Sequence, residues 1–94
     1  LIENIPRSIP NGYTANIDLS KIKVLNIFKW IKSKNVSDLE MLKTFNCGVG
    51  FCIITDKQKV KKVKKFFIKK FEPYQIGYIN KSSSKINFIK KIKW

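Results

Sequence analysis

The stretch that decides the fold is Met41-Leu42-Lys43-Thr44-Phe45-Asn46-Cys47-Gly48-Val49-Gly50, which continues into Phe51-Cys52-Ile53-Ile54. Its polar turn, Asn46-Cys47-Gly48, joins a short helical pattern to an apolar run typical of a central strand that is covered on both faces. Glycine lacks a Cβ atom, so Gly48 and Gly50 permit positive φ angles and the close approach of a ligand or another backbone. The turn is therefore the part of the chain best suited to form a site from main-chain groups.

The sequence before this stretch predicts one strand and two helices. Residues 13–18 alternate apolar and polar side chains, which predicts a half-buried strand. Apolar side chains then recur at the spacing of an amphipathic helix, at Val24, Ile27, Phe28 and Ile31. Ser37-Asp38-Leu39-Glu40 is a capping box, which predicts a short helix that ends at about Thr44.

The sequence after it predicts a third helix and two further strands. Asp56 is the expected N-cap of a helix over residues 57–71, and residues 74–79 alternate as a strand. The last strand starts at Ile86, and its alternation breaks at Ile89, which predicts a bulge or an early end. Val49 to Ile79 would then form a βαβ crossover, and the final two strands a hairpin. The whole predicts an α+β domain with a mixed sheet of about four strands and about three helices.

The charge of the chain admits two interpretations. Its 20 basic and 6 acidic residues give a net charge of +14, which favours a nucleic-acid or anionic-membrane binder. Phe66, Phe67, Tyr74 and Tyr78 lie near lysines and could stack on single-stranded bases, so a small lysine-rich nucleic-acid-binding module is the alternative function. However, 19 of the basic residues are Lys, and Ala15 is the only alanine, which indicates the compositional bias of an AT-rich genome. No nucleic-acid motif is present, and no apolar run is long enough to cross a bilayer.

The two cysteines suit a reducing cytoplasm. Cys47 and Cys52 are five positions apart, which on a strand places them on opposite faces, so no disulfide is expected between them. Without histidine they form no zinc site, and we expect no metal ligands in the chain. Cys52 is expected to be a buried thiol, and Cys47 lacks the neighbouring base that a nucleophile needs. The chain opens on Leu1 without a targeting segment, and we interpret it as a C-terminal fragment.

Five segments carry a resemblance to one enzyme family, in the same order and spacing. They are Glu3-Asn4-Ile5-Pro6-Arg7, Asn16-Ile17-Asp18, Ile27-Phe28-Lys29-Trp30, Glu40-Met41 through Gly50, and Ile76-Gly77-Tyr78-Ile79. Together they resemble the E-N-I-P-R, strand, I-F-x-W, E-M-x-x-T-F-N-x-G-x-G and I-G-x-I segments of aminoimidazole ribonucleotide synthetase, or phosphoribosylformylglycinamidine cyclo-ligase. Phe51 departs from the Met that the family commonly has after G-x-G.

The resemblance implies a function for the parent enzyme. That family uses ATP and Mg²⁺ to close formylglycinamidine ribonucleotide into aminoimidazole ribonucleotide, a cytoplasmic step of purine biosynthesis, and its members are two-domain homodimers. Residues 1–94 would be the latter part of the C-terminal domain. The family's N-terminal ATP-binding domain and its histidine- and glycine-rich segment before E-N-I-P-R are absent, so this fragment alone is expected to be inactive. No specific nucleic-acid partner and no membrane are implied.

Five residues are candidates to line the ligand cleft, namely Asn4, Arg7, Asn46, Gly48 and Gly50. Arg7, the only arginine, could grip a phosphate or carboxylate with its planar fork, or pair with Glu3 to fix its loop. Asn4 and Asn46 could present amides to a ligand or stabilise backbone turns. The two glycines could contact an anion through their N–H groups or serve the backbone alone. No catalytic residue is assigned, because a lone carboxylate such as Glu3 is a weak signal for acid–base chemistry.

Overall fold

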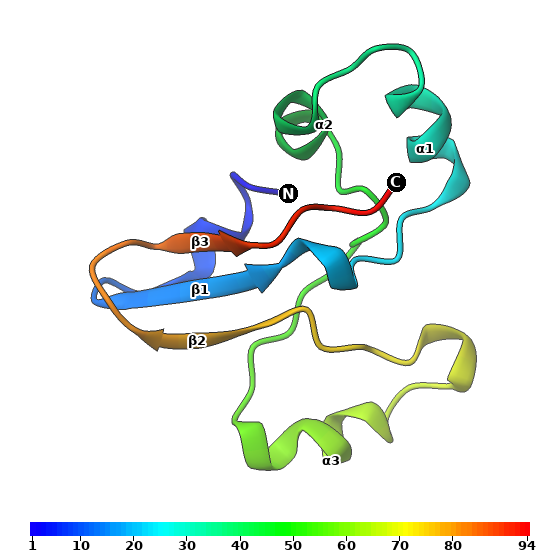
Figure 1. The fold of residues 1–94 in the computed structure, drawn as a ribbon. Coiled ribbons are helices and arrows are strands. Elements are labelled where there is room, and N and C mark those ends of the chain that lie inside the picture. The colour runs from blue at the N-terminus through cyan, green and yellow to red at the C-terminus, as the bar shows by residue number, and fades with distance from the viewer.

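Three strands form one sheet in the computed structural model, which describes residues 1–94 (Figure 1). β1 (Tyr13–Asp18) lies in the middle, β2 (Gly77–Lys81) pairs with it antiparallel, and β3 (Ile86–Ile89) pairs with it parallel. Since both edges of β1 are occupied, all residues from Thr14 to Ile17 are buried. The predicted α+β class with a mixed sheet is confirmed, with three strands rather than about four.

The last two strands do not form the predicted hairpin. β1 separates β2 from β3, so the loop that joins them passes the end of β1. The Ser82 N–H donates to the Gly12 carbonyl at 3.0 Å, and the Thr14 hydroxyl donates to the Ser84 carbonyl, which ties this loop to the turn before β1 and to the start of β1. The early end predicted at Ile89 is confirmed, because β3 stops there.

Two α-helices lie near the C-terminus of the chain in Figure 1, α1 (Asn26–Lys32) and α2 (Asp38–Thr44). The predicted cap of α2 is confirmed, since the Ser37 hydroxyl accepts from the Glu40 N–H at 3.2 Å. The reverse half of the capping box is not formed, because the Glu40 carboxylate accepts from the Thr44 hydroxyl at 3.2 Å instead.

The hydrophobic core connects the sheet with α2 and with both ends of the chain. Its buried members are Leu1, Ile9, Ala15, Ile17, Leu19, Ile22, Met41, Leu42, Cys47 and Ile92. Phe28 and Ile31 of the predicted α1 stripe pack against this core, whereas Ile27 is exposed. At the C-terminus, the Trp94 indole N–H donates to the Asp38 carboxylate at 2.9 Å.

The apolar run from Val49 to Ile54 is not the predicted central strand. It is irregular, and residues 50–55 make no backbone hydrogen bond. Phe51 is 87% exposed and Cys52 is also exposed, so the predictions of a covered strand and of a buried Cys52 thiol are wrong. β2 and β3 occupy both edges of β1, so β1 is the central strand, and the run does not pair with the outer edge of β2 or β3 either. The predicted βαβ crossover is therefore absent.

The predicted helix over residues 57–71 is reduced to α3 (Val60–Lys64) between two short 3-10 helices. Asp56 occupies the predicted N-cap position, directly before Lys57–Lys59, but its side chain makes no capping hydrogen bond, and its carboxylate lies 3.5 Å from the Lys59 ammonium instead. Lysines four positions apart repel one another along this segment, and Phe66 is 80% exposed. The lysine-rich helix thus lacks both the charge balance and the packing that would extend it.

The 3-10 helices in the structure are Ile5–Ser8, Leu19–Lys21, Lys57–Lys59 and Lys69–Phe71. In Figure 1, α3 lies beyond β2, away from α1 and α2. No helix is both long enough and apolar enough to span a membrane.

Candidate functional site

The turn after α2 has an unusual backbone that its sequence explains. Cys47 has a φ of 55° and Gly48 a φ of 115°, so two consecutive residues adopt the left-handed region. The Asn46 side-chain oxygen accepts from the Gly48 N–H at 2.9 Å, and the Asn46 carbonyl accepts from the Val49 N–H at 2.9 Å. Asn46 therefore closes the turn with its own side chain, as asparagine commonly does.

Gly48 is required by the space around it as well as by its φ angle. A Cβ atom at this position would lie 2.6 Å from the Lys23 carbonyl oxygen, which is backbone and cannot move aside easily. At Gly50 a Cβ would meet nothing within 4 Å, and its φ is not positive. The two glycines that look alike in the sequence thus differ, because only Gly48 is needed for the backbone shape.

The N-terminal segment is held against this turn. The Leu1 main-chain nitrogen donates to the Leu42 carbonyl at 2.9 Å and to the Phe45 carbonyl at 3.2 Å. These carbonyls belong to the end of α2, whose last turn leaves them without partners within the helix. This docking places Asn4 on the same side of the molecule as the turn that follows α2.

An open trough of about 1900 Å³ runs between the N-terminal segment, the turn after α2, the sheet and α3. Asn4, Asn46, Gly48 and Gly50 all line it, so the fold brings together four of the five candidates. Both amide side chains are exposed and can meet a ligand. Eighteen of its 34 lining residues are hydrophobic, and the others include the charged residues Lys43, Asp56, Lys57, Lys61, Lys64 and Glu72.

Arg7 does not line the trough. It is exposed in the 3-10 helix Ile5–Ser8 and belongs to none of the three ion pairs of the structure, so it does not pair with Glu3. Glu3 is also exposed and outside the trough. The polar residues Ser8, Thr44 and Gln75 do line it; Thr44 belongs to the E-M-x-x-T-F-N-x-G-x-G segment, whereas no sequence signal distinguished Ser8 and Gln75, which the folding of distant segments brings there.

A comparison of the sequence with known families identifies the chain's relatives. A family profile described as "AIR synthase related protein, C-terminal domain" matches residues 1–89. The chain belongs to this family. The "Phosphoribosylformylglycinamidine cyclo-ligase" proteins of Staphylococcus aureus strains Newman and COL are 39% identical to it over 84 residues, and that of strain MSSA476 is 38% identical. These matches cover 87% of this chain and 25% of each relative, and no solved structure matches.

The side chains of this AIR synthase related domain are suited to binding and orienting a ligand. Cys47 is buried, and desolvation raises the pKa of its thiol, so the nucleophilic thiolate is disfavoured. The chain has no histidine to act as a base, and no group of three or more acidic or cysteine side chains gathers as a metal site. The trough instead offers the amides of Asn4 and Asn46, the main chain around Gly48, and the side chains of Ser8, Thr44 and Gln75 as hydrogen-bonding groups.

Proposed function

We propose that the chain is part of a phosphoribosylformylglycinamidine cyclo-ligase, the enzyme whose name its relatives carry. Such an enzyme uses ATP to close formylglycinamidine ribonucleotide into aminoimidazole ribonucleotide in purine biosynthesis. The five ordered motifs and the 39% identity support this proposal. Two free cysteines agree with a reducing cytoplasm.

We further propose that residues 1–94 form the latter part of the family's C-terminal domain. The complete polypeptide would be as long as the relatives and would form a homodimer. The chain spans a quarter of the length of these relatives. The trough exposes apolar side chains that a folded domain normally covers, among them Phe51 and Ile54. The rest of the C-terminal domain would cover part of this surface.

The single observation that carries the functional proposal is the convergence of Asn4 and Asn46 on one trough. Their amides can donate to and accept from the formyl amide and amidine groups of the ribonucleotide. Since an amide is neither an acid nor a base at neutral pH, the role proposed for Asn4 and Asn46 is to orient the substrate. ATP would bind together with the remainder of the enzyme. The carboxylates of this chain do not gather in a way that fits Mg²⁺, so we assign it no metal ligand.

Asn46→Asp in the complete enzyme tests this role. The aspartate keeps a side-chain oxygen to accept from the Gly48 N–H but removes the amide donor and adds a charge that repels a phosphorylated substrate. The expected result is an unchanged melting temperature and a kcat/KM at least about fivefold lower, since one hydrogen bond contributes about 1 kcal/mol. Asn11→Asp, in an exposed turn outside the trough, is the matched control. If Asn46→Asp keeps normal kinetics, Asn46 only closes its turn.

A second candidate function is single-stranded nucleic-acid binding. It is favoured by one observation, the exposure of Phe66, Phe71 and Tyr78 beside lysine-rich segments. A titration with single-stranded DNA separates the two functions. A nucleic-acid module would bind tightly beyond about 0.2 M salt, whereas an enzyme domain with a basic surface would lose weak binding below that concentration.

A further inference from the structure

A second hollow, of about 480 Å³, lies where the connection between β1 and α1 meets the segment that follows α3. Its lining residues are Lys23, Lys64, Lys69, Lys70, Glu72, Pro73 and Tyr74. It adjoins the trough but includes none of the candidate residues discussed above. Four of its seven lining residues are lysines, which makes it a strongly basic concave surface.

Tyr74 fixes the geometry of this lysine hollow. Its phenol oxygen accepts from the Lys23 main-chain N–H at 3.0 Å. The Lys23 ammonium lies 4.6 Å from the centre of the Tyr74 ring, in a cation–π contact. Because the phenol is the acceptor in its hydrogen bond, its own proton remains available for a ligand. Two segments 51 positions apart in the sequence are thereby joined at the site.

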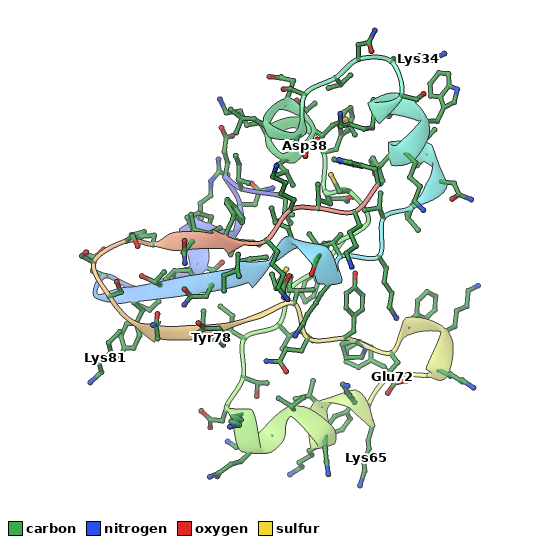
Figure 2. The ribbon with its side chains drawn as sticks, in the orientation of Figure 1. Lys34, Asp38, Lys65, Glu72, Tyr78 and Lys81 are labelled. Atoms are coloured by element: carbon green, nitrogen blue, oxygen red, sulfur yellow. The ribbon has the colours of Figure 1, made fainter.

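The charge of the lysine hollow is not balanced within the chain. Its four lysines face one carboxylate, that of Glu72, so three positive charges are in excess. None of these five side chains belongs to the three ion pairs of the structure. The Lys23 and Lys70 ammoniums lie over the Tyr74 and Phe71 rings, but the excess of three positive charges remains, and a multiply charged anion would be attracted to it. Figure 2 shows Glu72 in the segment that follows α3, whereas the Lys65 side chain points outward below α3.

We propose that the lysine hollow binds a compact anion with two or more phosphate groups, such as pyrophosphate. The lysine ammoniums would contact the phosphate oxygens as point charges, and the Tyr74 hydroxyl would donate one directed hydrogen bond. The volume is within the range of small-molecule sites and exceeds the needs of a single phosphate. The lysine hollow shares Lys64, Glu72, Pro73 and Tyr74 with the lining of the trough, but the pyrophosphate contacts proposed here involve neither Asn4 nor Asn46.

Calorimetric titration of the full-length protein with pyrophosphate, at fixed ionic strength, tests the proposal. Lys69→Gln/Lys70→Gln is expected to weaken binding by about tenfold or more, because two direct charge contacts are lost. The matched control is Lys62→Gln/Lys65→Gln, which removes the same charge from the same segment outside both hollows. It should change the affinity by less than about twofold, since only screened long-range charge is lost.

Tyr74→Phe separates a built site from a diffuse basic surface. It keeps the ring under Lys23 but removes the hydroxyl, so pyrophosphate should bind several times more weakly while melting shows a folded protein. The proposal is overturned if wild type shows no saturable binding, if both double variants weaken binding equally, or if Tyr74→Phe binds as wild type does. The readout is binding of pyrophosphate alone. The absence of this binding therefore leaves the cyclo-ligase proposal intact, and the absence of cyclo-ligase activity leaves the pyrophosphate proposal intact.

Discussion

Gly48 shows how one residue can decide the shape of the candidate site. Its φ of 115° follows a left-handed Cys47, and the Asn46 side chain closes the turn around it. The sequence correctly predicted that this glycine serves an unusual backbone. It could not distinguish Gly48 from Gly50, because the Lys23 carbonyl that crowds only Gly48 comes from a segment 25 positions earlier.

Gly48→Ala is therefore expected to lower the free energy of unfolding by roughly 1–3 kcal/mol, the usual cost of a strained backbone conformation. The added Cβ would also lie 2.6 Å from the Lys23 carbonyl oxygen. Urea denaturation of both glycine variants measures the effect. Gly50→Ala is the control, since its Cβ meets nothing within 4 Å, and it should be neutral or slightly stabilising. Equal losses in the two variants would contradict this account.

Asp18, at the end of β1, gives the chain a pH-dependent contribution to stability. The Ser20 hydroxyl donates to its carboxylate at 2.6 Å, the Ser20 N–H donates at 3.0 Å, and the Lys90 ammonium lies 3.4 Å away. The Ser20 hydroxyl bond is the main cause that lowers the pKa of Asp18 in the folded state. A lowered pKa means that the folded protein favours the ionised carboxylate more than the unfolded chain does.

The resulting stability is present above the unfolded pKa of about 3.9 and is lost as the pH falls through the lower folded pKa. Wild type should therefore lose stability below about pH 4 more steeply than Asp18→Asn. Urea denaturation of both proteins at several pH values between about 6 and 2 measures the difference. Parallel curves for the two proteins would show that Asp18 does not contribute.

At the scale of elements, the pairing of β2 with β1 depends on close backbone approach. Gly77 begins β2 opposite Ile17, and a Cβ built on it would lie 2.0 Å from the Asn16 carbonyl oxygen. Beside it, the Asp18 N–H donates to the Ile76 carbonyl at 2.7 Å. Only a residue without Cβ allows β2 to start at this register.

Gly77→Ala is expected to displace the start of β2 and to destabilise the protein by more than 1 kcal/mol, because the obstructing atom is backbone. Hydrogen exchange should show loss of protection at the Tyr78 and Asn80 amides, which face β1, while α2 stays protected. Gly50→Ala again serves as the control. If β2 keeps its protection in Gly77→Ala, the strand tolerates the Cβ and the close approach is not essential.

At the scale of the whole molecule, the core lies on the side of α1 and α2, and the α3 side is sparsely packed. Large apolar side chains exposed on that side are Phe51, Ile54, Phe66, Ile68 and Phe71. A stable single domain rarely leaves so much apolar surface open, and an unpaired apolar segment is also a hazard for aggregation. This distribution supports the proposal that residues 1–94 belong to a polypeptide as long as the relatives, and that the rest of this polypeptide covers the trough.

That proposal predicts different hydrogen exchange in the complete protein and in residues 1–94 alone. The amides of residues 50–55 make no hydrogen bond in the structure described here and should exchange rapidly in the isolated chain. In the complete protein they should be protected, because a covered apolar strand must pair its backbone groups. The amides of α2 are the internal reference in both. Rapid exchange of residues 50–55 in the complete protein would show that the segment stays open.

The sequence by itself determined the elements that depend on neighbours within a few positions. These are β1, the Ser37 cap of α2, the end of β3 at Ile89 and a glycine-dependent turn after α2, together with the family that the ordered motifs identify. Each follows from side-chain alternation, a local hydrogen bond or a backbone conformation, which act over short distances along the chain.

Only the tertiary structure decided which segments meet. The order β2-β1-β3, the exposure of Val49–Ile54, the burial of Cys47 and the contact of Tyr74 with Lys23 could not be read from local patterns. An apolar run becomes a central strand only where other strands pair with both of its edges, and here β1 takes that place between β2 and β3. Strand pairing depends on distant segments competing for the same hydrogen-bonding groups, so local sequence alone does not decide it.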